Sequence, residues 1–173
     1  LVPYVDYLLF RDRKRGRVAL NIGGITNLTA IPPGAGPDDV VAFDTGPGNC
    51  LMDHWTREHK RASYDVSGEW AASGQADPTL LDSLLSDPYF QLMPPKSTGT
   101  DYFSPAWLEA HLEGLPALAP ADVQASLLQL TAQSIATAIG THGNACNRLL
   151  VCGGGAHNDT LMQALAEQLP GIT

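Results

Sequence analysis

The chain has 173 residues, enough for one domain of ordinary size that buries a core without disulfides or metals. An apolar content of 44% with 16% charged residues is a globular composition, neither that of a disordered chain nor that of a membrane-spanning one. Ten basic against eighteen acidic residues give a net charge of -8, which disfavours nonspecific binding to nucleic acid or anionic lipid.

The first half of the chain predicts a β-hairpin, a third strand and a helix, over residues 17–22, 27–31, 40–43 and 49–59. Gly23-Gly24 stands at the hairpin turn, where glycine supplies the backbone freedom that a two-residue loop needs. The third strand delivers Asp44 to its carboxyl end, and Asn49 is a good N-cap for the helix that follows.

The second half begins with its least regular part, residues 64–105, which we interpret as an insertion or flank around the core. Asp77-Pro78 and Ser104-Pro105 each predict the start of a short helix. The later elements are a helix over 122–139, a strand over 148–152, a turn at 153–155 and a helix capped by Asn158 or Asp159. This order of strands and helices predicts a mixed α/β sheet flanked by helices.

Three glycine-centred loops, at residues 21–27, 44–49 and 152–158, each follow an apolar run that predicts a strand. Glycine lets a backbone approach a ligand closely, so that consecutive N–H groups can point at one anion. The second loop also enters a helix N-terminus, where free N–H groups and the helix dipole favour a phosphate. Together the loops indicate phosphate and nucleotide binding.

The three loops match, in order, those of the second half of the anhydro-N-acetylmuramic acid kinases, and the chain resembles this family over almost its whole length. The motifs Tyr64-Asp65-Val66-Ser67-Gly68 and Pro94-Pro95-Lys96-Ser97-Thr98-Gly99 belong to the resemblance. The chain departs from the family at Thr26, where a smaller residue is usual, and at Thr100-Asp101, where an Arg-Glu pair is common. These departures concern fine contacts to the substrate.

The resemblance implies the actin-like, ribonuclease-H-like ATPase fold, with residues 1–173 as one nucleotide-facing domain of a two-domain kinase. It implies that Mg-ATP phosphorylates 1,6-anhydro-N-acetylmuramic acid while water opens the anhydro ring, giving N-acetylmuramic acid 6-phosphate in peptidoglycan recycling. The family's first phosphate loop and water-activating aspartate precede the segment that matches Leu1, and further sugar contacts follow Thr173. We therefore expect this chain to be part of a longer protein and to be inactive alone. The implied partners are ATP, Mg²⁺ and the amino sugar, and a homodimer is compatible with them.

The resemblance also implies which residues contact the nucleotide and its phosphates: Asn21, Gly23, Gly24, Asn27, Gly46, Gly48, Asn49, Gly153, Gly154, Gly155 and Asn158. Gly23-Gly24 resembles a phosphate-contacting turn, and the three glycines at 153–155 resemble the loop that contacts adenosine. Gly46, Gly48 and Asn49 are expected to supply backbone donors. Asp44 is the candidate catalytic carboxylate, which would hold Mg²⁺ through water or orient the phosphates.

Structural interpretations of the same residues remain open. Gly23-Gly24 alone is also the commonest kind of hairpin turn, Asp44 would equally cap the turn at Gly46, and three glycines also make a flexible turn. Lys96-Ser97-Thr98-Gly99 lacks the spacing of a P-loop, so it receives no phosphate role. Another sugar kinase or ATPase of the actin fold, or a non-catalytic binding module, would share these features.

The cysteines Cys50, Cys146 and Cys152 are odd in number and lack the spacing of a zinc site or a disulfide framework, which fits a reducing cytoplasm. Cys152 ends an apolar strand and is predicted to be buried. His157 has no second ligand at metal-binding spacing and is predicted to be a surface residue. A signal peptide and an apolar stretch of about 18 residues are both missing, so no membrane partner is expected.

Overall fold

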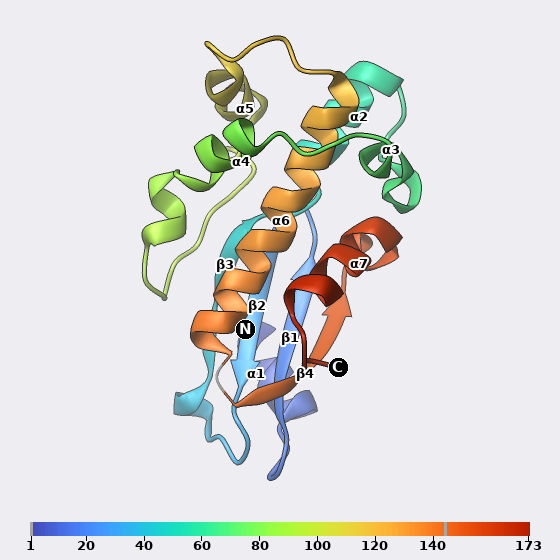
Figure 1. Ribbon diagram of the computed structural model, residues 1–173. Helices are drawn as coiled ribbons and strands as arrows, with labels where there is room; N and C mark the ends of the chain where they lie inside the picture. The colour runs from blue at the N-terminus through green and yellow to red at the C-terminus, as the bar shows by residue number, and fades with distance from the viewer. Residues whose placement is uncertain (1, 144) are drawn as a thin grey trace.

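A four-stranded mixed sheet forms the centre of the computed structural model, which describes residues 2–143 and 145–173 (Figure 1). Its strands are β1 (Gly16–Ile22), β2 (Ile25–Ile31), β3 (Val41–Pro47) and β4 (Cys146–Cys152). They lie in the order β3-β2-β1-β4, with β1–β2 and β2–β3 antiparallel and β1–β4 parallel. The predicted mixed sheet is therefore confirmed.

Seven α-helices surround the sheet in the described residues: α1 (Val2–Phe10), α2 (Cys50–Lys60), α3 (Glu69–Ala72), α4 (Pro78–Leu85), α5 (Pro105–Leu112), α6 (Pro120–His142) and α7 (Asp159–Gln168). In Figure 1, α6 and α7 cover one face of the sheet, α1 lies on the other, and α2 to α5 gather beyond one end. The side chains of Asp77, Ser104 and Asn158 cap α4, α5 and α7 by accepting backbone N–H bonds, as predicted. Helix α1 has no counterpart among the predicted elements.

The core lies between the sheet and α6. Alternate residues of β1, namely Val18, Leu20 and Ile22, are fully buried on the face toward this helix. Leu130 and Ile135 of α6 are also fully buried, and α3 and α4 pack on the same helix from the 64–105 region. These buried side chains hold the sheet against α6, and the glycine loops extend from one end of this sheet.

The opposite face of the sheet is only partly covered, by α1. Near the middle of β2 the Thr29 hydroxyl donates to Asp6 Oδ2 of α1 at 2.8 Å. Toward the end of the sheet, Cys152 pairs with Asn21 and is exposed, so the prediction that Cys152 is buried is wrong. The cause is its position at the last residue of β4, on the face that α6 and α7 do not cover.

Candidate functional site

The three glycine loops meet at one end of the sheet. The N–H groups of Gly48 and Asn49 donate to the carbonyl oxygens of Gly24 and Gly23, at 2.9 and 2.8 Å. The Asn49 side chain donates from Nδ2 to the Ile22 carbonyl at 3.3 Å, beside the loop that follows β4. Segments that are far apart in the chain are thereby held in one rigid cluster.

Close contact explains why glycine is needed at two of these positions. A methyl group on Gly48 would overlap the carbonyl oxygen of Gly23, and one on Gly155 would overlap the side chain of Ile22. Gly24 differs, because it is exposed and a methyl group there would make only ordinary contacts. Among the described residues, no backbone acceptor pairs with the Gly24 N–H, which leaves it able to donate to a ligand.

A row of polar residues crosses the sheet just below these loops. Asn21 of β1 pairs with Asn27 of β2, which pairs with Asp44 of β3. Residues directly opposite one another share a face of the sheet, so the three side chains lie on the face that α1 partly covers. Asp44 lies inside β3, three residues before its end, rather than at the end as predicted, because the strand continues to Pro47 and the β2–β3 register shifts between Thr26 and Asn27.

The Asp44 carboxylate is held by Ser97 and Thr98, in the loop to which no phosphate role was assigned. Its Oδ2 atom accepts from Ser97 Oγ at 2.8 Å and from the Thr98 N–H at 2.9 Å. The Asp44 N–H donates to the Lys96 carbonyl at 3.2 Å, so backbone and side chain are fixed together. Within the described residues Oδ1 has no hydrogen-bond partner, which leaves one carboxylate oxygen available.

Tyr89 and Lys96 add further hydrogen bonds around Asp44. The Tyr89 hydroxyl donates to the Asp44 carbonyl at 2.7 Å, and burial, together with the charge of Asp44, raises the pKa of Tyr89. The Tyr89 hydroxyl therefore stays protonated and remains a donor at neutral pH. Lys96 Nζ donates to the Tyr89 carbonyl at 3.0 Å and lies 4.5 Å from the centre of its ring, and burial lowers the pKa of Lys96.

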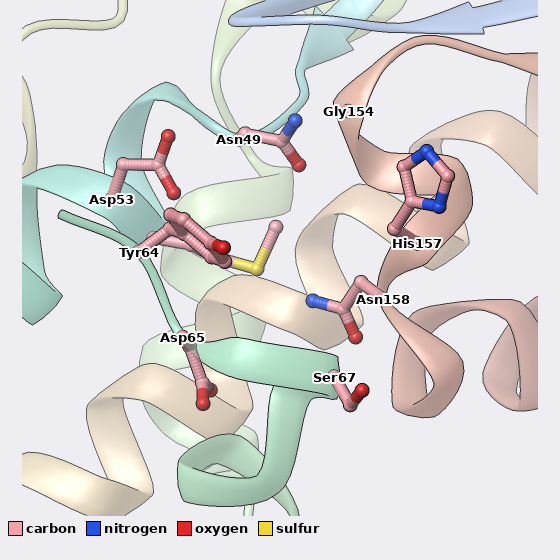
Figure 2. A pocket seen from close by; sticks show the side chains of 9 residues that line it. Asn49, Asp53, Tyr64, Asp65, Ser67, Gly154, His157 and Asn158 are labelled. Carbon is pink, nitrogen blue, oxygen red and sulfur yellow. The ribbon is translucent and has the colours of Figure 1, made fainter.

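A cavity of about 320 Å³ opens beside the glycine cluster (Figure 2). Its walls come from the start of α2, from the segment Tyr64–Ser67 and from the loop Gly154–Asn158. The volume lies within the range of about 300 to 1,000 Å³ that is usual for small-molecule sites. Met52 and the ring of Tyr64 give it an apolar side, and Asn49, Asp53 and Asn158 give it polar groups.

Comparison with known proteins identifies the chain's relatives. The family described as anhydro-N-acetylmuramic acid kinase matches residues 1–173. The chain belongs to this family. Kinases of that name from Cupriavidus pinatubonensis and Ralstonia nicotianae are 51% and 52% identical to it over 174 aligned residues, which cover 99% of the chain. The kinase from Pseudomonas syringae pv. tomato is 51% identical over 170 residues, or 98% of the chain.

These matches cover 46% of each relative, so the chain spans about half the length of the curated relatives it matches. In the described residues no helix is long and apolar enough to cross a membrane. The same residues contain no group of three or more His, Cys, Asp or Glu side chains that would hold a metal.

In the loop before α2, several of the residues expected to contact phosphate are engaged within the protein. The N–H groups of Gly48 and Asn49 are already paired within the protein, and Gly46 is buried in β3, so this loop does not present the expected phosphate donors. Asn49 precedes α2 as predicted, but its backbone is already helical and its side chain makes no capping hydrogen bond; its Nδ2 atom donates to the Ile22 carbonyl. Gly48 and Asn49 thus hold the hairpin turn in place, and the backbone of Gly24 is exposed to solvent.

The loop after β4 borders the cavity. Gly153 and Gly154 are exposed, Gly155 is buried, and Gly154 lines the cavity. Asn158 lines it too, although its Oδ1 atom is used to cap α7 through the Leu161 N–H at 3.0 Å. His157 is exposed at the rim, which confirms its assignment to the surface. Asp53 and Tyr64 were not expected here, because nothing in the local sequence shows which loop the start of α2 will face.

Proposed function

We propose that this chain is the nucleotide-facing part of a kinase that transfers phosphate from ATP to 1,6-anhydro-N-acetylmuramic acid, while water opens the anhydro ring. The product would be N-acetylmuramic acid 6-phosphate, made during peptidoglycan recycling. Membership of the kinase family carries the proposal, and the meeting of three glycine loops beside a cavity of nucleoside size supports it. We place the protein in the cytoplasm, which the three unpaired cysteines favour.

We also propose the actin-like ATPase fold for this region, as one domain over residues 1–173. Three antiparallel strands followed by a helical crossover to a parallel fourth strand support this assignment. In such a domain the nucleotide would lie at the sheet end where the loops meet, with a second domain completing the cleft. The isolated chain would then bind part of the nucleotide but lack kinase activity. A homodimer of the complete protein is compatible with this arrangement.

The residues divide between the two ends of the nucleotide. Gly23 and Gly24 would face the phosphates, with Asn21 and Asn27 as amide donors on the adjoining strands. The loop Gly153–Gly155 and Asn158 would face the nucleoside, because Gly154 and Asn158 line the cavity. Phosphoryl transfer depends mainly on such positioning and on neutralising charge at the phosphate oxygens.

Asp44 is the proposed partner of Mg²⁺. A single carboxylate fits this ion, because Mg²⁺ keeps several waters and takes its other ligands from substrate phosphates. When bound, Mg²⁺ would neutralise charge on the transferred phosphate. The chain's own contribution is to hold Asp44 Oδ2 on Ser97 and Thr98, so that Oδ1 keeps one orientation.

The decisive experiment is a mass-spectrometric product assay on the complete protein with Mg-ATP and the anhydro sugar. The proposal expects a product heavier than the sugar by one phosphate and one water. Consumption of ATP without this product would indicate another sugar kinase or ATPase, which competition among several sugars would then identify. If nothing turns over and Asp44→Ala leaves the biological activity unchanged, the fold serves as a non-catalytic binding module.

A further inference from the structure

One wall of the cavity is built by Asp53 and Tyr64, which face the loop of Gly154 across it (Figure 2). Asp53 lies in the first turn of α2, and Tyr64 follows soon after the helix ends. Arg61 ends α2 in a left-handed conformation, at φ 54°, which turns the chain back so that Tyr64 lies beside the helix start. Two side chains eleven residues apart in sequence thus border the same space.

Asp53 differs from the other carboxylate of the cavity in having no partner. Asp65 accepts from the N–H groups of Trp70 and Ala71, both at 2.9 Å, and is thereby committed to the start of α3. No hydrogen bond or ion pair to the Asp53 carboxylate occurs among residues 2–143 and 145–173. Burial raises the pKa of Asp53, and the charge of Arg57, one turn further along α2, opposes this rise only in part.

A half-buried carboxylate without a partner favours a ligand that brings hydrogen-bond donors. The same negative charge repels phosphate, so a bound nucleotide would place its triphosphate away from Asp53, toward Gly24. That orientation puts the nucleoside in the cavity, where its N–H and O–H groups can reach Asp53. The ring of Tyr64 is 59% exposed and offers a face on which a base can stack.

We propose, building on the kinase function above, that Asp53 determines nucleotide specificity by accepting hydrogen bonds from the nucleoside, with Tyr64 stacked on the base. The donors are the ribose hydroxyls or the exocyclic amino group of adenine, which offer the carboxylate the same chemistry. A nucleoside that lacks the contacted donor would leave Asp53 buried without compensation and would bind weakly.

The test is calorimetric titration of the complete protein with Mg-ATP in the absence of sugar, which reports binding independently of turnover. Asp53→Ala should raise the Kd for ATP by about tenfold to a hundredfold, as expected for loss of hydrogen bonds to a charged group. Asp53→Asn keeps the side-chain shape and one acceptor oxygen, so it should raise the Kd for ATP by a smaller factor. Asp82→Asn, which removes an exposed charge from α4, is the matched control and should bind like the wild type.

Nucleotide analogues then identify the donor. With one of three analogues, namely 2′-deoxy-ATP, 3′-deoxy-ATP or the purine triphosphate that lacks the 6-amino group, the Kd of the wild type should rise by a factor similar to that caused by Asp53→Ala. The Kd of Asp53→Ala itself should not rise further with that same analogue. ATP binding by Asp53→Ala within twofold of the wild type would overturn the role of Asp53 and leave the kinase function intact. If every analogue weakened binding equally in the wild type and in Asp53→Ala, the role of Asp53 would also be overturned. A wild type that does not bind ATP would overturn both proposals.

Discussion

Replacing Gly48 by alanine should separate the loop after β3 from the hairpin turn. The added methyl group would overlap the Gly23 carbonyl oxygen and lie 2.7 Å from Thr26 Oγ1. Neither neighbour can move away, because Gly23 accepts the Asn49 N–H at 2.8 Å and Thr26 is 0% exposed. Overpacking of this kind costs about 1 to 3 kcal/mol, and weakening the two loop-to-loop hydrogen bonds adds about 1 kcal/mol each. We expect a total loss of about 3 kcal/mol or more.

The assay is the urea midpoint of the complete protein, followed by tryptophan fluorescence, since Trp55 lies on α2 directly after this loop. Gly24→Ala is the matched control, because its methyl group would approach Thr100 Cγ2 only to 3.4 Å. We expect this control to change the free energy of unfolding by about 0.5 kcal/mol or less. Equal stability of the two variants would refute the reasoning that Gly48 is required by contact with the hairpin.

Three further changes test other parts of the site. Thr26→Val should stabilise the protein by about 1 kcal/mol in urea unfolding, because Thr26 Oγ1 is buried without a hydrogen-bond partner among the described residues; a loss of stability would contradict this. Ser97→Ala should lower kcat for the sugar by about threefold to tenfold with little change in the KM for ATP, because Asp44 loses one of its two fixed contacts; Ser97→Thr should restore kcat, and a change in KM alone would contradict the positioning role. For Asp53, a pKa raised by burial means that the folded protein binds more protons than the unfolded one, so stability falls as pH rises from about 4 through the raised pKa. Asp53→Asn should abolish that slope and be more stable than the wild type at pH 7, and an unchanged slope of urea midpoint against pH would count against burial as the cause.

Features that depend on neighbouring residues in the chain could be predicted from sequence. Asp77, Ser104 and Asn158 cap their helices because each places an acceptor next to the free N–H groups of the first turn. The strands were predicted from their apolar runs, with ends that differ by up to four residues. Thus β3 continues through Asp44 to Pro47, although its last residues are not an apolar run.

Features that depend on distant residues could not be predicted. Ser97 and Asp44 are 53 positions apart, and only the path of the loop brings them within 2.8 Å. Cys152 ends an apolar run, which is typical of a buried residue, but its exposure depends on which part of the sheet α1 covers. The glycine loops could be recognised in the sequence, whereas the internal hydrogen bond of the Gly48 N–H became apparent only from the packing.

Under the proposed function, helix α2 would connect recognition of the nucleoside to the position of the phosphates. The N–H groups of Asn49 and Cys50 at its start hold the carbonyls of Gly23 and Gly24, at 2.8 and 3.2 Å. The same turn carries Asp53, whose N–H bonds to the Asn49 carbonyl at 2.8 Å. A nucleoside that displaces Asp53 would therefore also move the Gly23-Gly24 turn, which we propose to face the phosphates. Discrimination against a wrong nucleotide would then lower the turnover rate as well as the affinity, so that fidelity is enforced at the chemical step even when such a nucleotide saturates the protein.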